Sequence, residues 1–183
     1  MRFVDFLRAA VLTSAAAASA LAAVTLAGVA GGGQDQVIPV AAGWWVVAGL
    51  IGLWLGRRSQ TSEPIAGLLA SARTQASLPE VNPARALLNR LWPLLLSTLG
   101  AAALGLVAPQ IPAIAAGFAI IGALAWRRQA SAVTAIEERD GARFYLEPTS
   151  PLRPIRLVRT PGFRSNRLEL HGSVASRTAR PRV

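Results

Sequence analysis

Four long stretches without a charged residue constrain this chain more than any other feature of its sequence. They cover residues 9–31, 37–56, 91–108 and 111–126. An α-helix needs about 17 to 25 apolar residues to cross the hydrocarbon core of a bilayer. The fourth stretch is short for a span, but it can cross if its helix begins within the corner from Pro109 to Pro112 and Trp126 anchors its end at the headgroups. We therefore expect an all-α membrane protein with four transmembrane helices.

The composition agrees with a membrane protein and excludes several kinds of site. The mean hydropathy is +0.42, and 52% of the residues are apolar. The absence of cysteine excludes disulfides, thiol catalysis and metals bound by cysteine. His171 is the only histidine, so we expect no metal site, no cofactor and no Ser-His-Asp triad. All 19 basic residues are arginine, which indicates a GC-rich genome and a bacterial source.

Arginine and tryptophan residues at the ends of the spans predict the orientation. Arginine is retained on the cytoplasmic side of inserted helices, and an Arg pair directly follows the second and the fourth span. The segments then expected inside carry net charges of +1, +3 and +7, and those expected outside carry −1 and 0. We expect a multi-pass protein of the bacterial plasma membrane with both termini in the cytoplasm. The expected membrane-interface anchors are Trp54, Arg57, Arg58, Trp92, Trp126, Arg127 and Arg128.

The first apolar run also has features of a secretory signal peptide. Basic residues precede an Ala-rich stretch that ends in small residues. The run is about 23 residues long, whereas the apolar region of a signal peptide is about 7 to 15, which favours a retained anchor. Cleavage would leave the orientation of the other three spans unchanged.

Two segments seventy positions apart end in the same way. The chain reads "LIGLWLGRRSQ" at 50–60 and "IIGALAWRRQA" at 120–130, and Pro39 and Pro109 keep the same offset. The repeat predicts two tandem helical hairpins of the same orientation, an arrangement found in transporters with parallel repeats. The alternative is that any two spans that end inside acquire proline at the start and arginine at the end.

Small residues recur four positions apart in every expected span. The hydrophobic effect does not drive helices together in lipid, so close contact requires small side chains along one face. The expected helix-packing residues are Gly28, Gly32, Ala48, Gly52, Gly56, Ala101, Gly105, Ala113 and Gly117. Such stripes fit a neighbour in the same chain or in another subunit. Trp44 and Trp45 fit the outer interface belt, and an aromatic pair that binds a ligand is the alternative.

The loop at 57–90 predicts two helical segments. Ser62 followed by Pro64 can begin a short amphipathic helix on the membrane surface. Its apolar face would consist of Ile65, Leu68, Leu69 and Ala72. Asn82 with Pro83 can begin a second helix that runs into the third span, where Pro93 predicts a kink.

The chain divides into three expected regions: the four-helix bundle at 1–128, a cytoplasmic region at 129–163, and a disordered basic tail at 164–183. In the middle region we expect a helix that stops at Gly141 and then a short β-hairpin formed by 143–147 and 155–159. The residues expected to dock a partner are Phe144, Tyr145, Ile155 and Leu157. The basic charge favours anionic lipid headgroups over nucleic acid, so we expect no nucleic-acid partner.

The segment "RRQASAVTAIEERDGARFYLEPTSPLRPIRLVRTPGFR" at 127–164 resembles the tails of uncharacterised small four-span integral membrane proteins of GC-rich actinobacteria. The resemblance is one of general pattern. It implies a location in the bacterial plasma membrane, and it implies no activity and no functional residues.

The expected spans contain no ionisable residue, whereas proton relays and ion-coupled carriers commonly use such groups. We therefore expect a non-catalytic accessory, assembly or scaffold subunit that contacts the lipid bilayer and other membrane protein subunits. One alternative is a homo-oligomeric transporter or pore. A second is a lipid-modifying enzyme with Glu137, Glu138 and Asp140 at the cytoplasmic face, although solvated ion pairs are the ordinary role of such residues.

Overall fold

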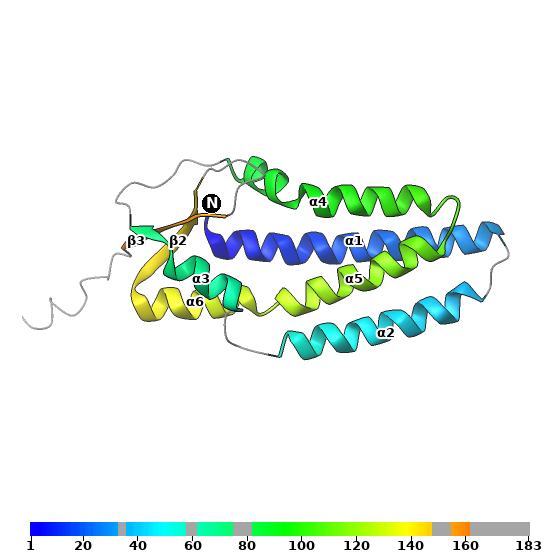
Figure 1. Ribbon diagram of the computed structural model, residues 1–183, viewed down its shortest axis with the longest axis horizontal. Helices are drawn as coiled ribbons and strands as arrows, with labels where there is room; N and C mark the ends of the chain where they lie inside the picture. Colours follow the sequence, from blue (N-terminus) through cyan, green and yellow to red (C-terminus); the bar gives the residue numbers. More distant parts are fainter. Residues whose placement is uncertain (33–35, 58–61, 75–81, 148–154, 162–183) are drawn as a thin grey trace, which may run out of the picture.

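The computed structural model describes residues 1–32, 36–57, 62–74, 82–147 and 155–161. Within these residues it confirms a mostly helical integral membrane protein with four long apolar helices and a short sheet near the C-terminus (Figure 1). The helices are α1 (Phe3–Gly32), α2 (Val37–Leu55), α3 (Glu63–Ala70), α4 (Pro83–Leu104), α5 (Gln110–Trp126) and α6 (Gln129–Asp140). The strands are β1 (Arg73–Thr74), β2 (Ala142–Leu146) and β3 (Leu157–Pro161). The tail expected at 164–183 lies outside the described residues.

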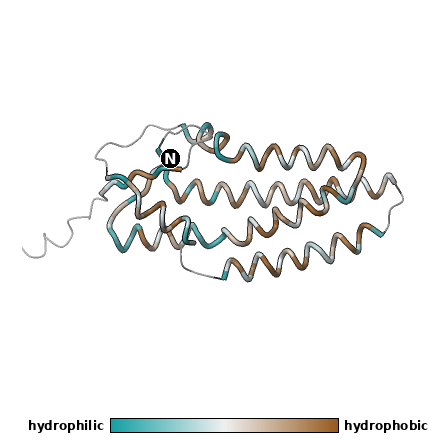
Figure 2. The backbone as a smooth tube through the Cα atoms, in the orientation of Figure 1, coloured by the Kyte–Doolittle hydropathy of each residue, from teal (hydrophilic) through white to brown (hydrophobic). Residues whose placement is uncertain are grey.

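The four expected spans correspond to α1, α2, α4 and α5, each long and apolar enough to cross a membrane. The largest difference is at α1, which begins at Phe3 although Asp5 and Arg8 lie in its first turns. α4 begins at Pro83, where the Asn82 side chain accepts a hydrogen bond from the Ala84 N–H at 3.1 Å. Figure 2 shows apolar residues along the four long helices, with hydrophilic residues gathered toward the end that carries the N-terminus.

The long helices lie side by side in the order α4, α1, α5, α2 (Figure 1). Consecutive helices form two up-down hairpins, but α5 of the second hairpin lies between α1 and α2 of the first. α5 packs extensively against both, whereas α1 and α2 barely contact each other. The two expected hairpins are therefore interlocked, and α5 holds the bundle together.

Glycine residues allow α2 and α5 to approach closely. A Cβ atom at Gly52 of α2 would lie 2.8 Å from the Cβ of Leu124, and one at Gly56 would collide with the backbone of α5. A Cβ at Gly117 of α5 would overlap the indole ring of Trp44. Backbone packing at this distance maximises dispersion contacts, which are the main attraction available between helices in lipid.

The end of the bundle that carries the N-terminus has a separate hydrophobic core, which we call the base cluster. It contains Phe3, Val4, Phe6, Leu7, Ile65, Ala130, Val133, Phe144, Leu146 and Leu157. These side chains come from the first turns of α1, from α3 and α6, and from the sheet. Burial of the first two turns of α1 in this core explains why the helix continues past the charged residues that limit the expected span.

α3 forms where Ser62 and Pro64 predict it, but its apolar face contacts protein as well as the membrane boundary proposed for it. Ile65 is only 2% exposed and belongs to the base cluster, and Leu68, Leu69 and Ala72 pack against that cluster. Ser62 forms no side-chain cap. Its N–H instead donates to Oε1 of Gln129 at 3.2 Å, which links the start of α3 to α6.

The expected hairpin is confirmed, and the structure adds two partners that the sequence does not predict. β2 and β3 pair antiparallel, with Phe144 opposite Arg159, and the helix before β2 ends at Gly141 with φ of 58°. β1 pairs parallel to β3 on its other side. The start of the chain extends the sheet beyond β2, since the Leu146 N–H donates to the Met1 carbonyl at 3.1 Å.

The close approach of α2 and α5 predicts different effects for two glycines on the same helix. Gly117→Ala should lower the free energy of unfolding by about 1 to 3 kcal/mol, because the added methyl group overlaps the ring of Trp44. Gly122→Ala is the matched control, since a Cβ there meets nothing within 4 Å. The measurement is thermal unfolding in detergent followed by circular dichroism. Equal midpoints for the two variants would contradict the tight packing described for Gly117.

Candidate functional site

The acidic residues at the end of α6 are the first candidate, because they were the possible centre of an enzyme. Glu137 is buried, and both of its oxygens are engaged. Oε2 accepts a hydrogen bond from Nη2 of Arg2 at 2.8 Å, and Oε1 accepts one from the Phe144 N–H at 3.0 Å. Glu137 thus ties the start of the chain and β2 to α6. The hydrogen bond from Arg2 to Glu137 also raises the pKa of Arg2 above its ordinary value.

The other two carboxylates near this position are exposed. Asp140 accepts a hydrogen bond from Nε of the neighbouring Arg139 at 2.9 Å, and both side chains lie at the surface. In the part of the chain that the structure describes, no group of three His, Asp or Glu side chains is placed to hold a metal ion. This arrangement favours a structural role for Glu137 and ordinary surface roles for Glu138 and Asp140.

The four residues expected to dock a partner have different environments. Phe144 and Leu157 are 2% and 3% exposed and belong to the base cluster, so their side chains serve the chain's own core instead of a partner. Ile155 packs against the same cluster, and Tyr145 is partly buried on the strand that pairs with Arg2. Alternation along β2 turns Phe144 inward, and from the sequence alone either face of the hairpin could have been exposed.

The expected anchors mark one end of the bundle. Nη1 of Arg128 donates to the Arg57 carbonyl at 3.3 Å, so the ends of α2 and α5 meet there. Arg127 is exposed, while Arg58 lies outside the described residues. The side chains of Trp54, Trp92 and Trp126 are 67%, 42% and 45% exposed on the outside of the bundle, where a bilayer can reach them.

The expected helix-packing residues gather at two contacts. On α2 and α5, Ala48, Gly52, Gly56, Ala113 and Gly117 are buried. At the other end, a Cβ at Gly28 of α1 would lie 3.3 Å from Pro109, and one at Gly105 would lie 2.8 Å from Pro112. Ala101 is partly buried on α4, and Gly32 is the last residue of α1.

Trp44 and Trp45 bind α5 through their indole nitrogens. Nε1 of Trp44 donates to the Ile114 carbonyl at 3.1 Å, and Nε1 of Trp45 donates to the Ala113 carbonyl at 2.9 Å. The Trp44 ring also contacts Phe118 edge-on, with ring centroids 5.6 Å apart. These contacts use both indole N–H groups within the bundle, which leaves neither donor for the ligand considered as an alternative.

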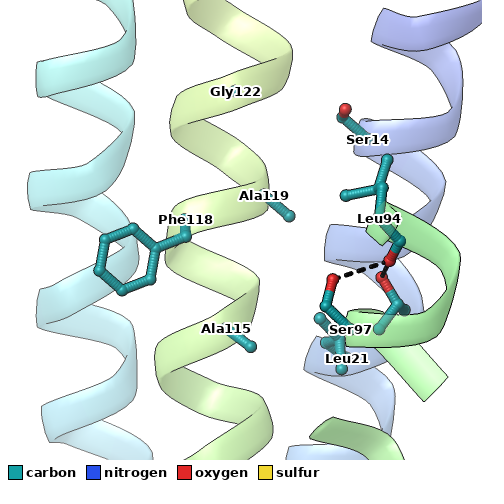
Figure 3. Close-up of a pocket in the computed structure, with 9 residues that line it drawn as sticks. Ser14, Leu21, Leu94, Ser97, Ala115, Phe118, Ala119 and Gly122 are labelled. Carbon is teal, nitrogen blue, oxygen red and sulfur yellow. Dashed lines mark hydrogen bonds between the residues drawn. The ribbon is translucent and has the colours of Figure 1, made fainter. Parts of the chain in front are cut away.

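A groove of about 300 Å³ lies between α1, α4 and α5 (Figure 3). Its lining consists of Ser14, Leu21, Leu94, Ser97, Thr98, Ala115, Phe118, Ala119 and Gly122. The hydroxyls of Ser97 and Thr98 both donate to the Leu94 carbonyl, at 2.9 and 2.7 Å. The sequence analysis does not identify this groove. The available signal was the second stripe of small residues on α5, Ala115, Ala119 and Gly122, which runs beside the stripe that contains Gly117.

The outward face of α4 is the largest apolar surface that the chain does not cover itself. In the most apolar 18-residue window of α4 no residue is buried, against 22%, 17% and 28% in the other three candidate spans. Leu96 and Leu99 are exposed on this helix, and a Cβ at Gly100 would meet nothing within 4 Å. We call the surface formed by Leu96, Leu99, Gly100 and Leu104 the α4 face.

The contacts of Glu137 predict a measurable stability effect. Glu137→Ala should lower the free energy of unfolding by about 1 to 3 kcal/mol, because it leaves Arg2 and the Phe144 N–H without their acceptor. Glu138→Ala, at the exposed neighbouring position, should change it by less than about 0.5 kcal/mol. Chemical denaturation in detergent measures both. A Glu137 variant as stable as the Glu138 variant would show that the buried carboxylate does not hold the sheet.

Comparisons with known proteins assign no family to the chain. No protein-family model, no curated protein and no solved structure matches it. The resemblance of residues 127–164 to actinobacterial membrane proteins therefore remains an expectation. The argument for a function rests on the geometry of the bundle and of its base.

Proposed function

We propose that this protein is a non-catalytic accessory, assembly or scaffold subunit of a complex in the bacterial plasma membrane. The observation that carries this proposal is the α4 face. α4 is long enough to cross the membrane, yet no residue in its most apolar window is buried by the rest of the chain. A second membrane subunit packed on α4 would supply the missing helix contact.

The shape of the α4 face fits a neighbouring helix. Gly100 lies one turn from Leu96 on the same side of α4, so it leaves a shallow hollow between larger side chains. Helices in lipid associate where small residues allow close approach, because dispersion contacts replace the missing hydrophobic drive. The glycines of α2 are used within the chain at Gly52 and Gly56, whereas Gly100 has no such neighbour.

The orientation of the subunit follows from its arginines. The contact between Arg128 and the Arg57 carbonyl brings the ends of two spans together beside the sheet. Arginine is retained on the cytoplasmic side, so the proposed topology puts the base cluster and both termini in the cytoplasm. Arg8 and Arg127, which are exposed near this end, would then contact anionic lipid headgroups.

Two other functions have less support. A transporter or pore needs a polar path, but α5 is in direct contact with α2 at Gly52 and Gly56 where the repeat would have to separate. A lipid-modifying enzyme needs free acidic groups, but both oxygens of Glu137 are engaged in holding the fold. The accessory role requires neither feature.

The accessory role predicts that a single substitution on α4 releases a partner. Gly100→Leu should fill the hollow of the α4 face without disturbing the chain, since a Cβ there meets nothing within 4 Å. Gly43→Leu on α2 is the matched control, because it lies in equally open space on another helix. Each tagged variant is expressed at native level, extracted from its own membrane in mild detergent and examined by native mass spectrometry.

The expected result is a foreign subunit in fixed stoichiometry with the unmodified chain and with Gly43→Leu, and its loss with Gly100→Leu. A closed ring of identical chains with nothing else bound would overturn the proposal and favour the homo-oligomeric pore. Retention of the foreign subunit by Gly100→Leu would show that the partner binds elsewhere than on the α4 face.

A further inference from the structure

The groove between α1, α4 and α5 lies at membrane depth. Its lining residues occupy positions 14–21 of α1, 94–98 of α4 and 115–122 of α5, all within the candidate spans. Ser97 and Phe118 line the groove and are also exposed on the outside of the bundle, so the groove opens toward the surrounding lipid. Water is scarce at this depth, so an open apolar groove is occupied by lipid or by protein.

Ser14 differs from every other hydroxyl in the described spans. Five hydroxyls donate to a carbonyl three or four residues earlier in their own helix, namely those of Thr13, Ser19, Thr25, Ser97 and Thr98. The Ser14 hydroxyl has no hydrogen-bond partner among the residues that the structure describes, and it lies at the same end of the groove as Gly122 (Figure 3). An unpaired hydroxyl in an apolar setting favours a ligand that brings an acceptor.

Exposed arginines lie beyond the Ser14 end of the groove. Arg8 precedes Ser14 by six positions on α1, which corresponds to about 9 Å along the helix axis. Arg127 follows Gly122 by five positions at the end of α5, or about 7 Å. In a phospholipid the ester carbonyls lie directly inside the phosphate. A lipid whose ester reached Ser14 would therefore present its phosphate toward these two arginines.

The size of the groove excludes a helix as its occupant. One turn of an α-helix about 10 Å across and 5.4 Å long fills roughly 400 Å³. The groove holds about 300 Å³ and extends over two turns of α1, so it fits a slender chain. The hydroxyls of Ser97 and Thr98 are already bonded to the Leu94 carbonyl and present an apolar surface to that chain.

We propose that this groove binds one acyl chain of an anionic phospholipid, with Ser14 donating a hydrogen bond to the ester carbonyl and Arg8 and Arg127 contacting the phosphate. The proposal is independent of the accessory role, because it concerns the single chain in a bilayer. It assigns a lipid-binding site to a part of the spans distinct from the α4 face.

The test uses phosphatidylglycerol that carries a photoactivatable diazirine in one acyl chain. The full-length protein is reconstituted in phosphatidylcholine vesicles that contain a small fraction of this probe, illuminated, and digested to map the crosslinked residues. A second set of vesicles carries phosphatidylcholine with the same diazirine. We expect the phosphatidylglycerol probe to label the groove at Ala115, Phe118 and Ala119, with several-fold less labelling by the phosphatidylcholine probe.

Two variants and their controls make the test specific. Gly122→Leu should fill the groove and reduce labelling about tenfold or more, while Gly49→Leu, which also projects into open space but on α2, should not. Ser14→Ala is nearly isosteric and should reduce labelling about two- to tenfold, as expected for one lost hydrogen bond. Ser19→Ala, which removes a hydroxyl already bonded to the Ala15 carbonyl, should leave labelling unchanged.

Three results would overturn the proposal. Equal labelling by the two probes would remove the role of the arginines. Labelling that persists in Gly122→Leu, with circular dichroism unchanged, would place the lipid outside the groove. A Ser14→Ala variant labelled like the unmodified protein would show that Ser14 does not bind the ester.

Discussion

The close approach of α2 and α5 is the contact on which the rest of the bundle depends. In lipid, apolar side chains gain little by leaving their solvent, so a helix pair is stable only where backbones come near enough for dense dispersion contacts. Gly52, Gly56 and Gly117 make that approach possible. Because α5 occupies this position, it separates α1 from α2, and the two hairpins interlock instead of standing beside each other. The indole N–H groups of Trp44 and Trp45 then satisfy themselves on carbonyls of α5.

The base of the bundle is held together by a different force. Phe3, Phe6 and Ile65 are removed from water there, so the hydrophobic effect operates as it does in a soluble domain. The Glu137 carboxylate adds a polar link between the start of the chain and β2. The N-terminal residues consequently have two roles, since Met1 extends the sheet and the next residues begin the first span. Packing of the base thereby fixes the height and rotation of α1 at one end, and the contact of Gly28 with Pro109 limits it at the other.

Local sequence signals were sufficient for the elements and insufficient for their neighbours. Charge-free windows predicted four spans, Asn82 marked the start of α4, and Gly141 marked the end of α6, because each signal depends on residues a few positions apart. The early start of α1 was missed because Asp5 and Arg8 interrupt the apolar window, and only the base cluster explains why the helix continues. β1 has two residues and no periodicity, so its pairing with β3 depends on contacts across eighty positions of the chain. The groove was also missed, because it arises where three helices diverge and no single helix encodes it.

α4 connects the two proposals physically. Leu94, Ser97 and Thr98 line the groove on one side of this helix, and Leu96, Leu99 and Gly100 lie on the outward side. A helix with so little of its surface buried is held in place weakly by protein contacts alone, so an acyl chain in the groove would add contacts between α4 and its neighbours α1 and α5. A ligand that binds only one arrangement of a protein stabilises that arrangement in proportion to its occupancy. Lipid in the groove would therefore favour the docked position of α4 and, with it, the position of the α4 face. By reciprocity, a subunit that binds the docked α4 face would tighten the hold of the groove on its lipid.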